Sequence, residues 1–399
     1  MENNVTTTTT TTSTTTTGDS TSQQHRSSSS LKLVEQKFKG HKDSVVFVTT
    51  HLNKPILASS SDDCTVRLWD IDRGSVIKCI NNFNGEPVNS IAFDKENLIY
   101  CAHSNKITCF DLRNDSLILK ESVNQLQFNT EEINQITFDS KFQYMASCDD
   151  SGAIKIIDIQ KNKLCETLKK HTNVCSNALF RPNSKNELIS GSYDYCVIQW
   201  DYLKAKLIRR ESFQQASHVL SAKQKEKQQR QILNPPFVHS LDLSHDGKLM
   251  AIGLGSGDIA INDISSFSTH LLLDSAHSAP LSQVHFPRFS GSAGSLDNSN
   301  SHLLLSAGND SNIILWDIEK KKDQQQQQQQ TSNKSKNNKQ STTQKAEEAE
   351  KEDAEEDQEK RIKAWTQHHS IVNWLTTSNR STSIYIADTS NDITVLTIQ

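Results

Sequence analysis

Three segments of the chain combine serine, histidine and aspartate, the residue types of a hydrolase triad, with a tryptophan. In each segment the aspartate follows the serine by four positions, the tryptophan follows the aspartate by six, and a histidine lies upstream. The three sets are His41, Ser59, Asp63 and Trp69; His171, Ser190, Asp194 and Trp200; and His277, Ser306, Asp310 and Trp316. An active site needs such a set only once. The repetition therefore favours a structural role, and we assign no catalytic residue.

The alternating pattern of apolar residues around these sets recurs, less regularly, in four other segments. Another residue takes the place of the tryptophan in each copy: Phe110, Ile157, Asn262 and Leu396. The three tryptophans and the four residues that replace tryptophan mark one anchor position per repeat. In chain order these anchor positions are 41, 47, 43, 62, 54 and 80 residues apart. Polar inserts at 211–231, 289–301 and 320–360 explain the three longest intervals. The remaining chain averages about 42 residues per repeat, the length of a four-stranded propeller blade.

Each repeat reads as four short strands with period-two alternation and turn residues between them. In the first repeat we place the strands at Val45–Thr50, Ile56–Ser60, Thr65–Asp70 and Val76–Asn81. Because such sheets bury their faces by radial stacking, the sequence predicts an all-β, seven-bladed propeller over 31–399. The blades lie near 41–82, 83–120, 128–168, 169–210, 232–270, 275–319 and 361–399. The last repeat lacks a fourth strand, and we expect residues 31–38 to supply it and close the ring.

Low-complexity segments account for much of the polar composition. Hydrophobic residues make up only 34% of the chain, and mean hydropathy is −0.61. Residues 1–30 are rich in threonine and serine, and the insert at 320–360 contains the glutamine run Gln324–Gln330. Such segments bury too little apolar surface to offset chain entropy. We predict a disordered N-terminal tail and a disordered or helical insert before the last blade.

Charge and cysteine usage narrow the class of partner. The net charge of −4 gives no general attraction to nucleic acid or to an anionic membrane. The eight cysteines form no C-x-x-C pair, so we expect reduced thiols and no metal site. The glycine-rich stretch 253–258 lacks the lysine of a phosphate-binding loop, and we expect no cofactor and no small-molecule substrate. The N-terminal stretch has no secretory signal pattern, which favours an intracellular protein, cytoplasmic, nuclear or both.

The repeat pattern resembles the WD-repeat superfamily. Several stretches, in order, resemble the family of WD repeat-containing protein 53: "EEINQITF", "SCDDSGAIKIIDI", "KKHTNVCSNALFRP", "QILNPPFVHSL" and "AGNDSNIILWD". The likeness covers roughly 35–319 and 361–399 and leaves out both low-complexity segments. It implies that the three histidine, serine, aspartate and tryptophan sets form buried hydrogen-bond networks, since buried polar groups need partners.

The same resemblance implies a partner. Proteins of this kind are candidate substrate receptors of cullin-RING ubiquitin ligases, recruited by the damage-specific DNA-binding adaptor through a Trp-Asp-x-Arg motif at the end of a repeat. The three tryptophan repeats of this chain lack the arginine, whereas Phe110–Arg113 keeps the aspartate and the arginine. Two interpretations stay open for Asp111 and Arg113: adaptor binding, or a surface ion pair at the end of a strand.

Three classes of function are compatible with a repeat protein of this composition. The favoured one is a non-enzymatic protein-interaction scaffold, since rigid propellers present loops at both rims. The alternative is a component of an RNA–protein or ribosome-assembly complex that uses the basic stretch Lys223–Arg230. That stretch has no interleaved aromatics, so nucleic-acid binding is not favoured. An enzyme would need a signature that occurs once, and we recognise none.

Overall fold

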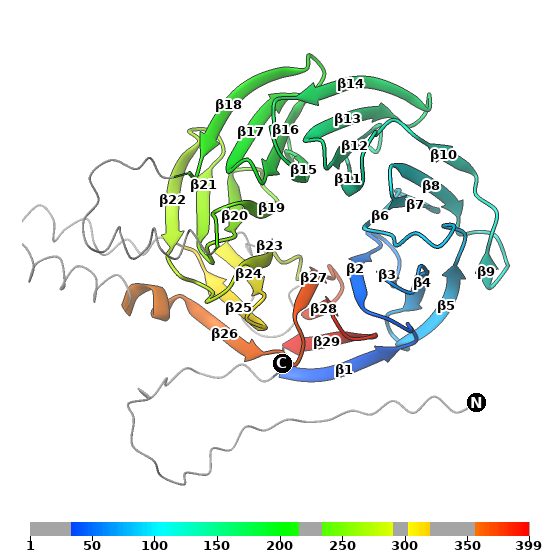
Figure 1. Cartoon of the computed structure of the whole chain (residues 1–399). Coiled ribbons are helices and arrows are strands. Elements are labelled where there is room, and N and C mark those ends of the chain that lie inside the picture. The colour runs from blue at the N-terminus through cyan, green and yellow to red at the C-terminus, as the bar shows by residue number, and fades with distance from the viewer. Residues whose placement is uncertain (1–32, 215–233, 290–301, 320–355, 399) are drawn as a thin grey trace, which may run out of the picture.

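The computed structural model describes residues 33–214, 234–289, 302–319 and 356–398. Seven antiparallel sheets lie in a ring, each with its first strand nearest the axis (Figure 1). This arrangement confirms the predicted seven-bladed propeller. The predicted tail at 1–30, most of the 211–231, 289–301 and 320–360 inserts, and the basic stretch Lys223–Arg230 lie outside the described residues.

The first four blades take up the chain in order. Blade one comprises Val45–Thr50 (β2), Ile56–Ser61 (β3), Val66–Asp70 (β4), Ser75–Ile80 (β5) and Ile118–Leu119 (β9). Blade two comprises Ser90–Phe93 (β6), Leu98–His103 (β7), Lys106–Asp111 (β8) and Asn124–Leu126 (β10). Blade three comprises Ile133–Phe138 (β11), Tyr144–Asp149 (β12), Ala153–Asp158 (β13) and Lys163–Lys169 (β14). Blade four comprises Cys175–Phe180 (β15), Glu187–Ser192 (β16), Cys196–Asp201 (β17) and Lys206–Ser212 (β18).

The last three blades complete the ring. Blade five comprises Val238–Leu243 (β19), Leu249–Leu254 (β20), Ile259–Asp263 (β21) and Ser268–Leu273 (β22). Blade six comprises Leu281–His285 (β23), Leu303–Gly308 (β24), Asn312–Asp317 (β25) and Ile362–Gln367 (β26), the last preceded by a helical turn at 356–360. Blade seven comprises Val372–Thr377 (β27), Ser383–Asp388 (β28), Asp392–Ile398 (β29) and Leu33–Lys39 (β1).

Blade seven joins the two ends of the described chain. Strand β1 pairs antiparallel with β29 over seven residues, from Leu33 opposite Ile398 to Lys39 opposite Asp392. Phe38 is 1% exposed and packs against Trp69 of blade one and Tyr385 of blade seven. The N-terminal strand therefore covers the outer edge of blade seven and joins it to blade one through shared core contacts.

Alternation along the strands produces a core that is continuous around the ring. In blade one every strand boundary lies within one residue of the position expected from the alternation. Its Phe47 and Val66 share a cluster with Ile99 and Phe110 of blade two. Ile156 of blade three and Trp200 of blade four share another. Each blade therefore depends on its neighbours for burial of its faces.

Blade two departs from the regular repeat after its third strand. The chain first runs beside blade one, where β9 pairs parallel with β5, and only then returns as the short outer strand β10. The Cys79 amide donates to the Leu117 carbonyl at 2.9 Å, and the Lys78 ammonium donates to the Asn114 and Ser116 carbonyls. Arg113 is followed by the polar residues Asn114, Asp115 and Ser116, and the Lys78 bonds satisfy the Asn114 and Ser116 carbonyls.

Alternating strand directions divide the turns between two rims. One rim holds the turns after the second and fourth strands of each blade, and we call it the histidine rim because His41, His171 and His277 lie there. The other holds the turns after the first and third strands, and we call it the arginine rim after Arg113. Functional side chains can therefore be sorted by rim.

Candidate functional site

The three repeated polar sets form closed networks with the same geometry. The histidine Nδ1 atoms lie 3.0, 3.0 and 2.9 Å from a carboxylate oxygen of Asp63, Asp194 and Asp310. The Nε2 atoms lie 2.7, 2.8 and 2.8 Å from the hydroxyls of Ser59, Ser190 and Ser306. Each hydroxyl also accepts a 2.8 Å bond from the indole of Trp69, Trp200 or Trp316. The sequence-predicted residues are thus brought together within each blade.

Burial decides what these networks can do. All three serines are 0% exposed and the tryptophans at most 1%. A substrate carbonyl could not reach the serine oxygen, which is enclosed between the imidazole and the indole. Burial disfavours charge on Asp194, but hydrogen bonds from His171 and two backbone amides outweigh it and hold the carboxyl pKa at about 2. Each network therefore links the turn that holds the aspartate, on the histidine rim, to the third strand, which holds the tryptophan.

Three other blades hold variants of this network that the spacing rule did not identify. In blade two, His103 bonds Thr108 at 2.8 Å and Glu86 at 2.6 Å. In blade three, Asn129 stands where the histidine would be and bonds Ser147 and Asp149. In blade seven, His368 lies 2.6 Å from Asp388. His103 is the last residue of the second strand of its blade, whereas Asn129 and His368 precede the first strands of theirs, so the three variants share no spacing that sequence could reveal.

Asp111 and Arg113 form an exposed pair on the arginine rim. The Arg113 guanidinium donates to both Asp111 carboxylate oxygens, with Nη2 at 2.6 Å and Nε at 3.0 and 3.1 Å. These bonds hold the pKa of the Asp111 carboxyl at about 2. The arginine side chain is 70% exposed. The pair fixes the plane of the guanidinium while leaving its remaining surface open to solvent.

Neighbouring blades carry related pairs, but with a different cation and spacing. Blade three pairs Asp158 with Lys161 at 2.8 Å, and blade four pairs Asp201 with Lys204 at 3.1 Å. Arg73 approaches Asp70 of blade one only to 3.9 Å. Each of these pairs spans three positions. Among the described residues, blade two alone presents a bidentate aspartate–arginine pair at the end of its third strand.

The segment that follows Arg113 is unusually apolar for a surface. Leu117, Val123 and Ile118 are 75%, 60% and 50% exposed. They are the three most exposed large hydrophobic side chains of the described chain. Exposed apolar residues that gather in one segment are characteristic of interaction sites. The segment 113–123, which links the third and outer strands of blade two and runs beside blade one, thus combines a fixed guanidinium with exposed apolar side chains.

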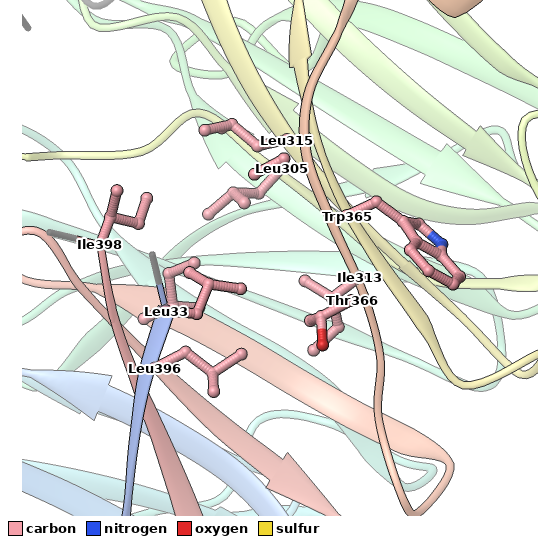
Figure 2. Close-up of a pocket in the computed structure, with 10 residues that line it drawn as sticks. Leu33, Leu305, Ile313, Leu315, Trp365, Thr366, Leu396 and Ile398 are labelled. Carbon is pink, nitrogen blue, oxygen red and sulfur yellow. The ribbon is translucent and has the colours of Figure 1, made fainter. Parts of the chain in front are cut away.

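A shallow apolar depression lies between blades six and seven (Figure 2). Its lining is mostly aliphatic, and only Trp365 and Thr366 bring a polar side-chain atom. Ligand pockets usually combine apolar walls with several convergent polar groups. We therefore interpret this depression as a packing seam beside the N-terminal strand.

Cysteines and metal-ligating residues do not gather. All eight cysteines are unpaired thiols, and burial raises the pKa of Cys101 and Cys175 well above the ordinary value. Within the part of the chain that the structure describes, no group of three histidine, cysteine or acidic side chains could hold a metal ion. In the same part, no helix has the length and apolar character needed to cross a bilayer.

Comparisons with known proteins agree with the repeat architecture. The family model for the WD domain, G-beta repeat, matches residues 32–70 and 162–201. The chain is 43% identical to the WD repeat-containing protein 53 homolog of Dictyostelium discoideum, over 92% of this chain and 95% of that protein. It is 25% identical over 41% of its length to the WD repeat-containing protein AAC3 of the same organism, 34% of which is covered. It is 24% identical over 43% of its length to the WD repeat-containing protein SL1-17 of Schistosoma mansoni, 55% of which is covered.

Proposed function

The chain belongs to the family of WD repeat-containing protein 53, and we propose that it is a protein-interaction scaffold that recruits the damage-specific DNA-binding adaptor of a cullin-RING ubiquitin ligase. In this proposal the adaptor binds the turn that carries Asp111 and Arg113, and the rest of the propeller holds the protein to be modified. The repeated serine, histidine and aspartate sets are buried and hydrogen-bonded to one another inside the propeller, so we assign the protein-binding function to the rims.

The observation that carries the proposal is the surface of blade two. The Arg113 guanidinium donates hydrogen bonds to the Asp111 carboxylate, and the arginine side chain is 70% exposed. The apolar side chains of Leu117 and Val123 follow it in the chain and are the most exposed of their kind in the described residues. An arginine anchor beside apolar residues is the composition of an interface hot spot. A free guanidinium would lose more rotamer entropy on binding than one already oriented by a carboxylate.

Affinity purification with quantitative mass spectrometry tests this proposal. The full chain should co-purify the adaptor, and Arg113→Ala should reduce adaptor recovery about tenfold or more, the loss expected of a hot-spot arginine. Arg73→Ala is the matched control, because Arg73 follows the third strand of blade one, is 81% exposed and has only a 3.9 Å contact to its aspartate. It should leave recovery unchanged.

Other results would contradict the proposal at different levels. Full recovery by the Arg113 variant would remove this turn from the interface. Wild-type purifications that contain ribosome-assembly factors and no adaptor would favour the RNA–protein alternative. Wild-type purifications that contain no stoichiometric protein partner would contradict the scaffold function itself.

A further inference from the structure

Four aromatic rings form a stack on the histidine rim, between blades four and five. The order is Tyr195, Phe237, Tyr193 and His239, with centroids separated by 5.0, 5.3 and 4.9 Å. Successive ring planes are inclined by only 22°, 27° and 29°. Two rings come from the turn between β16 and β17, and two from the entry into β19. No other part of the described chain carries a stack of this length.

Tyr195 occupies a backbone conformation that tyrosine rarely adopts. Its φ is +68°, in the left-handed region. Glycine stands at the corresponding turn position in blades three and five, as Gly152 and Gly257, also with positive φ. Blades one and six place the smaller side chains of Cys64 and Ser311 at this position, so Tyr195 is the largest residue in these five equivalent turns. Strained residues of this kind are concentrated at functional sites.

The four rings of the stack are all partly exposed to solvent. Among the described residues, the hydroxyls of Tyr193 and Tyr195 and the ring nitrogens of His239 have no hydrogen-bond partner. A Cβ atom on Gly255 would lie 3.1 Å from the His239 ring and 2.3 Å from the Pro235 carbonyl. The backbone at Gly255 therefore packs against the His239 end of the stack. Burial lowers the pKa of His239, which keeps the ring neutral near pH 7.

An exposed carboxylate, Asp150 of blade three, lies near the stack. The Asn134 amide donates to the Asp150 carboxylate at 3.0 Å and to the Cys175 carbonyl at 3.2 Å, and the Tyr193 amide donates to the adjacent Val174 carbonyl at 2.9 Å. Asp150 has no cation within ion-pair distance among the described residues. Burial and then the Asp150 charge raise the pKa of the Tyr193 phenol. Arg210, the nearby cation, is already directed to Asp194 and Cys196.

We propose that the stack binds an arginine side chain of a partner polypeptide, with Asp150 as the counter-charge. This proposal rests on the scaffold function and names the chemistry of one class of partner. A guanidinium is a planar cation that stacks on aromatic faces, and its fork of N–H groups can bond a carboxylate and phenolic oxygens. The exposed Asp150 carboxylate repels phosphate groups, so the arrangement favours a basic protein segment over nucleic acid.

Selection from phage-displayed random dodecapeptides on the immobilised full chain tests this assignment. Arginine should be enriched about threefold or more over the starting library, the effect of one exposed cation–π contact. Tyr195→Gly should abolish that enrichment, and Asp150→Asn should reduce it. Because glycine adopts the left-handed conformation without strain, the Tyr195→Gly variant should keep the wild-type strand signal in circular dichroism and a cooperative urea transition. Loss of binding then cannot be attributed to loss of fold.

The matched control is Cys64→Gly, the same change at the corresponding turn of blade one, where φ is +58°. It should leave arginine enrichment unchanged. The assignment is wrong if no arginine enrichment is found, if lysine is enriched equally, or if the Tyr195→Gly variant selects the same peptides. Binding of poly(U) RNA that is lost in that variant would also overturn it. None of these results contradicts the scaffold function, which fails only if purified wild-type protein retains no partner protein.

Discussion

Replacement of Asp194 by alanine is the perturbation whose effect can be worked out most fully from the structure. The carboxylate accepts hydrogen bonds from His171 Nδ1 at 3.0 Å, from the Thr172 amide at 3.1 Å and from the Cys196 amide at 3.0 Å. Its side chain is 3% exposed. Alanine leaves these donors without an acceptor, and His171 is itself 5% exposed, so water reaches it poorly.

Two routes give a consistent magnitude for this loss. A buried donor left unsatisfied costs about 1–3 kcal/mol. Independently, the carboxyl pKa of about 2 lies below the ordinary 3.8, a difference that corresponds to about 2 kcal/mol of stability. Because the folded-state pKa is depressed, this contribution is present above about pH 4 and is lost as the pH falls toward 2. The two values describe the same bonds and are not added.

Urea unfolding followed by tryptophan fluorescence measures the effect, since the Trp200 indole belongs to the same network. At pH 7 the Asp194→Ala variant should be about 2–3 kcal/mol less stable than wild type, and the gap should narrow to about half by pH 3. Asp72→Ala is the control: Asp72 is exposed, and its replacement should change stability by less than about 0.5 kcal/mol. Indistinguishable unfolding of the two variants, or a gap that widens in acid, would refute the structural assignment.

Three further predictions follow from the ring and its thiols. Deletion of 1–32 should leave the melting temperature nearly unchanged, whereas deletion of 1–39 removes β1 and Phe38, exposes the edge of β29, and should lower it sharply or cause aggregation in light scattering. Equal melting of both truncations would contradict the closure. A short Gly/Ser linker in place of 320–355 should preserve the circular-dichroism strand signal and a cooperative melt, since loop-closure entropy grows slowly with length; loss of folding would show that the replaced segment packs on the propeller. Exposed Cys165 should react with a thiol reagent well before buried Cys101 and Cys175, whose thiolates are disfavoured by burial, and equal rates in folded protein would contradict their burial.

The fold was predictable from sequence because the same pattern of residues recurs along the chain. Three tryptophan anchors fixed the register of the regular blades, and the apolar alternation placed strand ends in blade one within one residue. Blade two was less predictable. Its third strand has Phe110 in the position of the tryptophan, and the chain then crosses to blade one before the outer strand forms. Pairing of that kind depends on the neighbouring blade and leaves no local pattern.

The sites divide in a similar way. Residues linked by constant spacing, such as Ser190, Asp194 and Trp200, could be grouped from sequence, and so could the adjacent Asp111 and Arg113. The aromatic stack could not, because Tyr193 and Phe237 are separated by more than 40 positions and an insert of arbitrary length. Each aromatic residue alone reads as a turn or strand residue. Their proximity is created by the packing of blade four against blade five.

Direct binding between the purified chain and the purified ligase adaptor tests the central claim most sharply. Titration calorimetry should give a one-to-one complex for wild type and for Arg73→Ala, and binding weakened about tenfold or more for Arg113→Ala. Leu117→Asp should also weaken it, because this change places a charge on the apolar part of the proposed surface. Near-equal affinities of all four proteins would contradict the role of blade two, and no heat of binding by wild type at any accessible concentration, with none by an independent optical method, would contradict adaptor recruitment altogether.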